Sequence, residues 1–549
     1  MSANDPPSQS VSRRQKMLRG TLILGFGSLC SRMLGLLRDM LTAATFGMSA
    51  GGIMDAFATA FRLPDIARRF FSDGSLSASF VPVFAQVWAA DRQKAWTILS
   101  VTLFWCFLYL TAGVLIGELL CWIGIRYFDT DSRVFITAHL LSLLLPYLIL
   151  ISMAAVCSAA LQTLGHFTVS TLVPPILNII WLFGLSVIVP RCSDDPEGQC
   201  YVLTICILAA GVVQFLLHLP VMRSCGFRFR LHFSFVSGEV KKIFSGFVPQ
   251  FFGLMSVQLN LLTATAIAWA FSGGVHQPVY WLGNMISYPL RPGAASAIYY
   301  SERMYEFQHG IIGIAIASAI YPLLSHHAAE KNYAALNDDL TLGLRIQTML
   351  SIPAGFALML LSDSLTHLLF QRGAFSVMDT ARTADMVFWF GAGIWAFCAL
   401  PILIRAFYIL GDIRTPCRTG FGSLVLNAAL GLVLIYQFQE CGLIMAVSIS
   451  AAIHCLTLLT VFTLKHGHLD FTGLTLCICR TCFACSAMCI TIRSVMAVIP
   501  GHGSLDDLLR IFSCGIAGTF VFFVVYRGLG GRELGILFRG GIKKWRKKS

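Results

Sequence analysis

Charged residues are scarce in this sequence. Only 12% of its 549 residues are Asp, Glu, Lys or Arg, whereas 56% are hydrophobic and the mean hydropathy is +0.73. A soluble protein carries about twice that charged fraction. Apolar runs of about 20 residues, enough for a helix to cross a bilayer, recur along the whole chain. They do not alternate as the strands of a membrane β-barrel do. The composition therefore predicts an all-α polytopic membrane protein.

Motifs of enzymes and ATP-driven pumps are also absent. The sequence contains no GxxxxGK[ST] pattern, no clear HExxH or GxSxG pattern, and no dense aspartate motif. The ionisable residues within the apolar segments are mostly arginines, which stay protonated and act poorly as general bases. We therefore predict a transporter with no catalytic residues, no metal and no cofactor, in preference to a membrane-embedded enzyme.

The formal net charge of +13 raises the alternative of a nucleic-acid-binding protein. The placement of the cations argues against it, because they collect in alternate loops as the positive-inside rule predicts. We expect both termini in the cytoplasm, with the basic end at 543–548 near anionic lipid. The cation-rich loops hold Arg92, Lys94, Arg223, Arg228, Arg230, Lys241, Lys242, Lys331, Arg414, Arg418 and Lys465.

About fourteen transmembrane helices are predicted, arranged as two six-helix lobes and two C-terminal helices. The apolar run after the basic start is longer than a signal-peptide core and lacks a clear cleavage site, so we expect it to remain as the first span. Weak similarity at offsets of about 240 residues, as between 158–178 and 404–427, favours a parallel repeat, although chance similarity of apolar helices stays open. The expected parts are a cytoplasmic N-terminal segment at 1–19, an N-lobe at 20–222, a cytoplasmic linker at 223–245, a C-lobe at 246–464, two extra helices at 465–530 and a basic cytoplasmic tail at 531–549.

The first apolar segment carries charges that a membrane span tolerates poorly. Residues 20–47 include Ser31, Arg32, Arg38 and Asp39. A charge at bilayer depth costs about 2.5–3.5 kcal/mol on insertion scales, so it usually faces a wet cavity and has a function. Arg32 and Asp39 are seven residues apart and share a helix face. We therefore expect the Asp39 carboxylate to offset the charge of Arg32 and to leave the charge of Arg38 less compensated. The alternative is a structural ion pair at a helix seam.

A second charged group follows in the next segment. This group is Asp55 with Arg62, Asp65, Arg68 and Arg69, and Pro64 among them can break or kink a helix and free backbone groups near a cavity. Arg68 and Arg69 cannot share one helix face. We expect Arg68 in a central cavity with Arg69 in support, against the alternative of arginines that snorkel to the membrane boundary.

A third group lies near residue 300. Glu302 and Glu306 are four apart on one face, next to Arg303, and together could hold its guanidinium in a fixed direction. Arginine suits phosphate because its planar fork matches two oxygens. Several such arginines inside the membrane predict an interior anion site, with an ion-pair network between helices as the alternative.

The cysteines and paired histidines receive plainer interpretations. The cysteines within 477–489 lie in an apolar span, where a thiol is usually a small hydrophobic group. Cys192 and Cys200 flank a polar outer loop, and whether they form a disulfide is left open. His326 and His327 stand at a cytoplasmic helix end, where we expect them to cap the helix and not to bind metal.

Five motifs resemble one known family. They are SRMLGLLRD at 31–39, DAFATAFRLPDIARRFFSDGSLSASFVPVF at 55–84, YYSERMYEF at 299–307, FQRGAFS at 370–376 and RAFYILGDIRTP at 405–416. In order and spacing they look like the MurJ (MviN) family, bacterial lipid II flippases of the MOP transporter superfamily. The resemblance covers most of the chain.

The resemblance implies two lobes around a cationic cavity and a groove for the lipid tail beside the last two helices. It assigns substrate binding to Arg32, Arg38, Asp55, Arg68 and Arg303, with Ser31, Asp39, Arg69, Glu302 and Glu306 in support. Glu302 stands where the family usually has Asp, Asp65 stands where Asn is common, and the connection at 272–297 looks longer than usual, so its role is left open.

The expected function is the movement of lipid II, the undecaprenyl-pyrophosphate-linked peptidoglycan precursor, from the cytoplasmic to the outer leaflet by alternating access. The arginines would hold its pyrophosphate. The expected partners are lipid II and membrane lipids, not nucleic acid; a coupling cation or the membrane potential as the energy source stays open. The alternatives are a flippase for another polyprenyl-pyrophosphate-linked oligosaccharide and a MOP-type small-molecule exporter.

Overall fold

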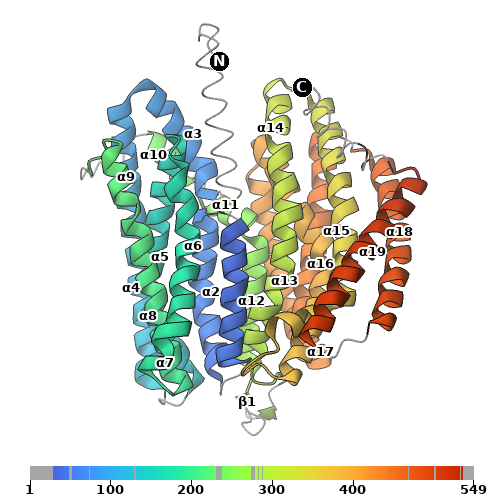
Figure 1. The fold of residues 1–549 in the computed structure, drawn as a ribbon. Coiled ribbons are helices and arrows are strands. Elements are labelled where there is room, and N and C mark those ends of the chain that lie inside the picture. Colours follow the sequence, from blue (N-terminus) through green and yellow to red (C-terminus); the bar gives the residue numbers. More distant parts are fainter. Residues whose placement is uncertain are drawn as a thin grey trace. The chain divides into compact units, whose positions relative to one another are not determined.

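The structure is a computed structural model. It describes residues 27–535 except 28, 49–51, 73–74, 129–131, 230–237, 246, 274–278, 282–283, 287–288, 468, 500–502, 532 and 534. The predicted N-terminal segment 1–19 and almost all of the tail 531–549 therefore lie outside the described residues. The described chain is nearly all helical and divides into two compact units, Met1–Phe251 and Phe252–Ser549 (Figure 1).

The first unit begins with a helix at residues 29–46. Long antiparallel helices follow, and α5 lies at the centre of the unit because α2, α3, α4, α6 and α8 all contact it. The elements are α2 (Ile53–Ser72), α3 (Ser75–Ala90), α4 (Arg92–Tyr127), α5 (Arg133–Thr163), α6 (Phe167–Phe183), the π-helix η2 (Gly184–Ile188), α7 (Val189–Cys192), α8 (Pro196–Leu216), α9 (His218–Ser224) and α10 (Gly238–Ser245); α11 (Phe247–Leu254) crosses the boundary between the units.

The second unit is built around α16, the most buried of the long helices. Its neighbours are α13, α14, α15 and α17. The elements are α12 (Ser256–Phe271), β1 (Val279–Trp281), β2 (Asn284–Ile286), α13 (Ala294–Gln308), the π-helix η3 (His309–Ile314), α14 (Ala315–Ala329), α15 (Tyr333–Phe370), α16 (Val377–Ile409), α17 (Arg414–His466), α18 (Phe471–Val498) and α19 (Ser504–Gly528).

Ten helical segments in the described part of the chain are long and apolar enough to cross a membrane, which confirms a polytopic all-α fold. One of them, α17, holds two predicted spans: Gln439 has φ 52° and ψ −137°, so the helix is interrupted between the predicted spans 418–437 and 441–464. The helix at 29–46 and α2 are not among the ten. The total of fourteen spans stays a prediction.

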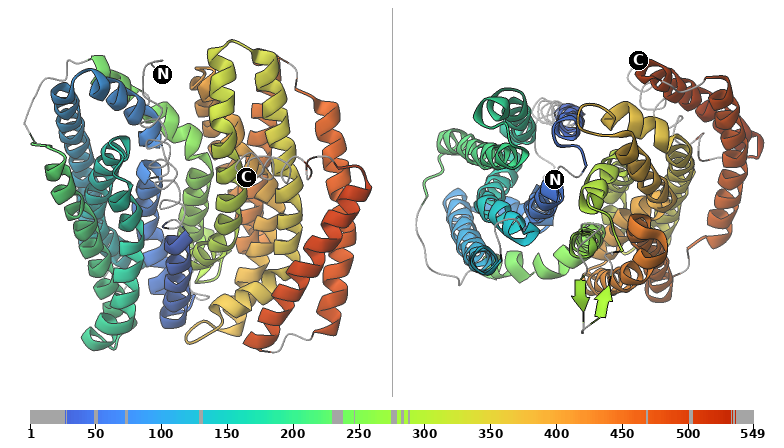
Figure 2. Two further views of the ribbon diagram at one scale, coloured as in Figure 1. Left: turned by 45° about the horizontal axis from the view of Figure 1, so that its top comes forward. Right: turned by 90° about the horizontal axis from the view of Figure 1, so that it is seen from below.

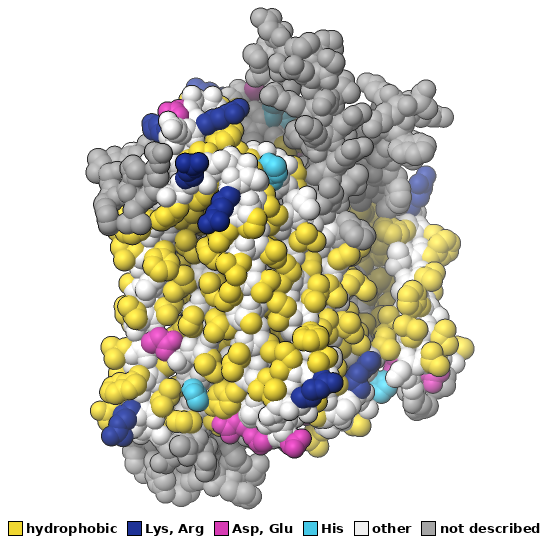
Figure 3. Space-filling view, turned by 60° about the vertical axis from the view of Figure 1, so that its left-hand side comes forward, with side chains coloured by type: hydrophobic (Ala, Val, Ile, Leu, Met, Phe, Trp, Pro, Cys, Tyr) yellow, Lys and Arg dark blue, Asp and Glu magenta, His cyan; other side chains and the backbone are white. Residues whose placement is uncertain are grey.

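The outer face of the first unit is a wide apolar belt. Figure 3 shows hydrophobic side chains over the middle of this face and charged side chains gathered toward its two ends. Phe107, Leu115, Ile116, Leu119 and Leu120 on α4 are all exposed. Exposed apolar surface on this scale is unfavourable in water and favourable against lipid tails. The face is therefore the lipid-facing side of the unit.

The last two helices lie side by side against α15 (Figure 2). A buried polar group joins them to α15: Arg345 Nε donates to Glu533 Oε1 at 2.9 Å, and Tyr526 Oη donates to Glu533 Oε2 at 2.7 Å. Because Glu533 is almost fully buried, its charge requires these partners. The contact fixes the C-terminal end of α19 to the second unit.

The GD-x-x-TP loop between α16 and α17 connects the two ends of α17 through hydrogen bonds. Asp412 accepts hydrogen bonds from the Thr415 backbone N–H at 2.9 Å and from Lys465 Nζ at 2.8 Å, at the far end of α17. Burial alone would raise the pKa of Asp412, but the hydrogen bonds from Lys465 and Thr415 outweigh it and lower the pKa to about 2. The loop therefore keeps its charge at any physiological pH.

The connection at 272–297 contains a short antiparallel hairpin in its described part. Val279 pairs with Ile286, Tyr280 with Met285 and Trp281 with Asn284. Beside it, Ser272 forms an isolated bridge with Leu290. A strand pair satisfies the backbone groups of a segment that leaves the helical bundle.

Glycine makes the closest approach between α15 and α16 possible. A Cβ on Gly355 would lie 2.5 Å from the Gly391 carbonyl oxygen, so the two backbones are in direct contact. Gly422 on α17 offers a matched control, because nothing lies within 4 Å of its Cβ position.

We expect Gly355→Ala to destabilise the protein by about 1–3 kcal/mol, since the methyl group forces the helices apart. Gly422→Ala should be neutral or stabilising by up to about 1 kcal/mol, since Ala favours helix over Gly. Thermal unfolding in detergent measures both. Equal midpoints for the two variants would contradict the close approach.

Candidate functional site

Arg38 is the most enclosed arginine of the candidate site. It is 7% exposed, and both its Nε and Nη2 donate to Asp39 Oδ1, at 2.9 and 2.7 Å. Nη1 donates to Asn178 Oδ1 on α6 at 3.0 Å. The carboxylate comes from the same helix as the arginine, and the link to the neighbouring helix is a neutral amide. The Asp39 charge and the Asn178 dipole therefore hold the guanidinium in a fixed direction.

An aromatic group supports this guanidinium. The Arg38 Cζ lies 4.5 Å from the Trp181 ring centroid, within cation–π range. Trp181 is fully buried, donates from Nε1 to Thr42 Oγ1 at 3.2 Å, and meets Phe57 and Phe61 of α2 edge-on at 5.7 and 5.2 Å. Three helices thereby converge on Arg38: its own, α6 and α2.

Arg32 lies one and a half turns earlier on the same helix. It is half-buried and forms no hydrogen bond or ion pair with any residue that the structure describes. The prediction that Asp39 would temper Arg32 and leave Arg38 freer is wrong: Asp39 binds Arg38. Arg38 and Asp39 are adjacent, and their side chains bend toward each other. Arg32 and Asp39 share a helix face, but seven residues separate them, which is too far for direct contact.

Asn178 also fixes the backbone next to Arg32. Its Nδ2 donates to the Ser31 carbonyl oxygen at 2.9 Å and lies 3.5 Å from Ser31 Oγ. One amide thus positions Ser31 and Arg38 together. Sequence reasoning missed Asn178, although it ends the repeat segment 158–178. Its counterpart Asn427 makes the same kind of bond in the second unit, from Nδ2 to the Asn260 carbonyl oxygen at 2.9 Å.

On α2, one buried carboxylate serves two arginines. Asp65 Oδ1 accepts from Arg68 Nη2 at 2.7 Å, and Oδ2 accepts from Arg69 Nε at 2.8 Å. The Arg68 side chain is 28% exposed and that of Arg69 only 11%, so Arg68 is the more accessible cation. The helix continues through Pro64, so this proline does not end it. Asp55 lies buried in the first turn of α2, where the helix dipole favours a carboxylate.

Tyr147 on α5 lies within the electrostatic influence of both arginine groups and was also missed. Its ring is completely buried, and its hydroxyl interacts electrostatically with Arg68, Asp65 and Arg38. The hydroxyl has no hydrogen-bond partner among the described residues. Gly211 on α8 makes room for the ring, since a Cβ there would lie 2.6 Å from Tyr147 Cδ2. From the sequence alone, a functional tyrosine in an apolar span cannot be distinguished from a tyrosine that packs in the hydrophobic core.

Arg303 belongs to the second unit and lies on α13. Its Nη1 donates to Glu306 Oε2 at 2.9 Å, and its Cζ lies 4.5 Å from the Tyr299 ring centroid. The prediction that Glu306 holds this guanidinium is confirmed. Glu302 is completely buried, and its predicted role in holding Arg303 stays a prediction. As in the first unit, the carboxylate comes from the arginine's own helix.

The FQRGAFS motif positions α13. Phe370 and Phe375 contact the buried Tyr300 ring at centroid distances of 5.2 and 5.4 Å. Ser376, the last residue of the motif, caps α16 in a reciprocal capping box with Asp379. This motif therefore supports the helix that carries Arg303.

The cysteines follow the plainer interpretation. Cys192 and Cys200 are both free thiols, so the structure contains no bridge between them. Cys477 and Cys485 are buried in an apolar cluster with Met349 and Phe522. A thiol in such surroundings packs as a small hydrophobic group.

The second unit also contains an apolar groove. Its volume is about 470 Å³, within the range of small-molecule sites. α15, α16, α17 and α18 line it, and its wall is almost entirely apolar. The lining residues include Phe356, Met359, Trp395, Leu459, Ile478 and Cys482. Such a groove suits a hydrocarbon chain.

The chemistry available to these side chains is binding. The first unit holds four arginines near two aspartates in the segments 32–39 and 65–69, which leaves a net positive charge among those six groups. Guanidinium groups bind oxyanions and do not exchange protons at neutral pH. The arrangement can hold a phosphate or pyrophosphate.

Comparison with known proteins agrees with this chemistry. The family model described as "Lipid II flippase MurJ" matches residues 42–513. The chain belongs to the lipid II flippase MurJ family. A protein of Vibrio cholerae named probable lipid II flippase MurJ is 30% identical over 80% of this chain and 82% of its own length. A namesake from Rhizobium tropici is 28% identical over 96% of this chain and 97% of its own.

Solved structures show the same fold. A lipid II flippase MurJ in an inward closed conformation superposes with a TM-score of 0.71 at 19% identity, covering 93% of this chain and 99% of that one. An inward-facing multidrug resistance MATE transporter of the MOP superfamily gives a TM-score of 0.60 at 12% identity, covering 81% and 95%. The family resemblance predicted from the motifs is confirmed by the family model and the Vibrio cholerae relative.

Removing the shared carboxylate tests the arrangement on α2. Asp65→Ala should destabilise the protein by about 3 kcal/mol, because it leaves two guanidinium groups without their counter-charge. Asp65→Asn, which keeps a hydrogen-bond acceptor, should cost less. The control is Asp194→Asn, an exposed loop residue. Thermal unfolding of detergent-purified protein measures all three; an Asp65→Ala midpoint equal to the control would refute the shared pairing.

Proposed function

We propose that this protein is a flippase that moves lipid II from the cytoplasmic to the outer leaflet. The observation that carries the proposal is the state of Arg32. It lies six residues before Arg38, which Asp39, Asn178 and Trp181 hold in place. Arg32 is a half-buried cation in an apolar helix, without a partner among the described residues. A cation left in that condition is costly unless an anion binds there.

The arginines have different roles in this proposal. Arg32 and Arg68 contact the pyrophosphate directly, because both are partly exposed and Arg68 leaves its Nη1 outside the bonds to Asp65. Arg38 supplies fixed positive charge behind them. Ser31, Asp39, Asp55 and Arg69 support the site, and Tyr147 offers a hydroxyl between Arg38 and Arg68.

Arg303 is the substrate-binding arginine of the second unit in this proposal, with Glu306 and Glu302 as its supports. Transporters built from repeats alternate access by moving one half against the other around a site near mid-membrane. We propose that the sugar–peptide head group travels in the hydrated interior while the polyprenyl tail stays in lipid and in the apolar groove of α15–α18.

The membrane potential favours this direction. A pyrophosphate carries about two negative charges, and an inside-negative potential favours moving each outward by ~2.3 kcal/mol per 100 mV. If the bound phosphate neutralises the arginines, the loaded step moves little charge. The empty return then moves positive charge inward, which the same potential favours.

The remaining parts of the proposal concern cellular context. The protein is a bacterial inner-membrane transporter and not an enzyme, with both termini in the cytoplasm, in keeping with its positive-inside loops. It needs no cofactor and binds no nucleic acid. Asp39, Asp55 and Glu302 are the residues through which a coupling cation would act.

The arginine assignment is tested by rescue of a bacterial strain depleted of its own lipid II flippase. Arg32→Ala and Arg303→Ala should each abolish rescue, since removing a charge-assisted phosphate contact costs about 1.5–3 kcal/mol. Arg38→Ala should abolish rescue as well, because it removes the fixed positive charge behind the contacting arginines. Arg38→Lys should fail largely as well, because an ammonium cannot replace the planar fork.

Arg126→Ala is the matched control, since Arg126 is exposed at the end of α4. All variants are compared at equal membrane protein level, with outer-leaflet lipid II measured directly. Normal flipping by Arg32→Ala and Arg38→Ala would defeat the site. Rescue of a strain lacking a different oligosaccharide flippase, and not of this one, would reassign the substrate.

The tail groove has its own test. Cys482→Trp should fill part of the groove and lower flipping about tenfold, because the displaced chain loses apolar contact worth ~25 cal/mol per Å². Cys479→Trp is the control on the same helix, exposed and outside the groove lining. Transport in vesicles loaded with a short-chain lipid II analogue compares them. Equal rates for the two variants would exclude the groove from substrate binding.

A further inference from the structure

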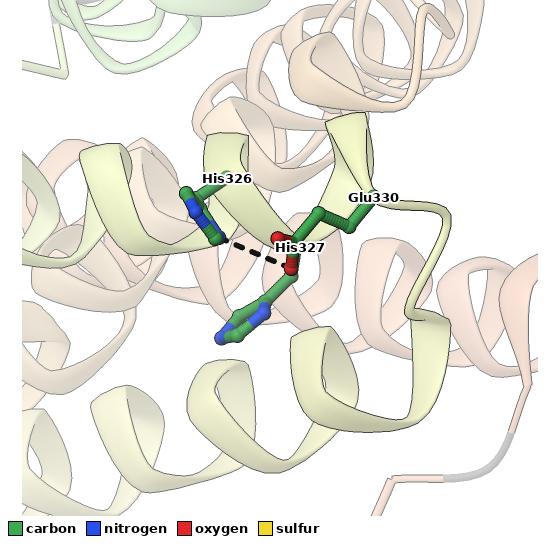
Figure 4. Close-up of side chains that lie close together, drawn as sticks. All are labelled: His326, His327 and Glu330. Atoms are coloured by element: carbon green, nitrogen blue, oxygen red, sulfur yellow. Dashed lines mark ion pairs between the residues drawn. The ribbon is translucent and has the colours of Figure 1, made fainter. Parts of the chain in front are cut away.

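Three potential metal ligands gather at the end of α14. His326, His327 and Glu330 occupy one turn, and their donor atoms all lie within 4.8 Å of one another (Figure 4). His326 Nδ1 lies 3.3 Å from Glu330 Oε2. The side chains of His326 and Glu330 are 65% and 57% exposed, so an ion can reach them from solvent.

The prediction that the two histidines cap the helix is wrong. The residue at the C-cap is Glu330, and its backbone N–H bonds the carbonyl oxygens of Ala328 and His326. The contacts found for the imidazoles within the described chain go to carboxylates instead: His326 to Glu330 and His327 to Asp339.

Asp339 orients one of the two imidazoles. His327 Nε2 lies 2.9 Å from Asp339 Oδ2 on α15. A carboxylate at Nε2 favours the proton on that nitrogen and leaves the lone pair on Nδ1. His327 Nδ1 is itself buried and has no hydrogen-bond partner among the described residues. In Figure 4 one ring nitrogen of His327 is turned toward the Glu330 carboxylate and the other away from it.

A buried acceptor without a partner costs about 1–3 kcal/mol. A metal ion would remove that cost, and the arrangement is the one metal sites use: a histidine ligand whose second nitrogen donates to a carboxylate. Two imidazoles and one carboxylate suit Zn²⁺ and its transition-metal neighbours and not Mg²⁺ or Ca²⁺, which prefer oxygen alone. Zinc binds such ligands at ~2.0–2.2 Å, and the three donor atoms lie within 4.8 Å of one another.

We propose that His326, His327 and Glu330 form a zinc-class metal site, with Asp339 positioning His327 and water in the fourth position. The site joins the end of α14 to the start of α15 across the turn at Lys331, which has a positive φ of 56°. The same continuous helical segment, Ala294–Ala329, carries Arg303 near its other end. Metal binding therefore restrains the helix that bears a substrate-site arginine, whichever anion that arginine binds.

Binding is measured on the full-length protein, purified without a polyhistidine tag and with accessible thiols alkylated, because exposed cysteines also bind zinc. Equilibrium dialysis against buffered Zn²⁺ should give one more bound ion for the wild type than for His327→Ala or for His326→Ala/Glu330→Ala. Co²⁺ in place of Zn²⁺ should give visible d–d bands of a tetrahedral site that the same variants lack.

Two controls separate a metal site from a surface effect. His166→Ala removes an exposed histidine from a different turn and should change nothing. Asp339→Asn should keep the bound ion at saturation but weaken its affinity about 10–100-fold, because substitutions of a group that orients a metal ligand have effects of this size. A purely structural role of Asp339 would not produce that shift in affinity.

Hydrogen exchange gives a readout independent of stoichiometry. Zn²⁺ should slow amide exchange across 326–339 in the wild type and in His166→Ala, but not in His327→Ala. Equal zinc content of the wild type and the double variant, both monodisperse, would overturn the proposal. So would an affinity weaker than about 1 mM, which unclustered surface histidines would provide.

Discussion

A cation inside a membrane protein needs a counter-charge, and the source of that charge decides what the cation can do. At the candidate site the carboxylates come from the arginine's own helix: Asp39 for Arg38, Asp65 for Arg68 and Arg69, and Glu306 for Arg303. Such pairs do not join helices. They tune and direct the guanidinium. The helix-joining function falls to neutral contacts, above all Asn178 and Trp181.

Pairs of the other kind occur elsewhere in the second unit. Arg345 with Glu533, Arg382 with Glu440 and Lys465 with Asp412 each connect segments far apart in the chain. They fasten the last helices and the helix ends, where a fixed structure is needed. The contrast between these pairs and the same-helix pairs supports the proposed binding role of Arg38, Arg68 and Arg303.

Much of this could be predicted from the sequence. The hydropathy predicted the polytopic helical class, and charges in apolar segments indicated Arg32, Arg38, Arg68 and Arg303 as candidate binding residues. Both signals are strong, because a span must be long and apolar and a charge within it is costly. The partner of Asp39 was predicted wrongly. The prediction used only which residues share a helix face, and this does not show that the side chains of two adjacent residues bend toward each other. Asn178 and Tyr147 were missed because one polar group in an apolar span has no pattern until its contacts are known. The histidine pair was misread because Asp339 lies on a different helix.

The same-helix pairing bears on how the chain is made. Helices enter the bilayer in sequence, before their later neighbours exist, and an arginine without a counter-ion hinders that step. The first helix carries Asp39 with Arg38, and α2 carries Asp65 with its two arginines, so each segment is partly neutralised when it reaches lipid. Only afterwards does α6 bring the amide and indole that orient Arg38. Insertion into the membrane and the proposed recognition of the substrate thus depend on the same few carboxylates.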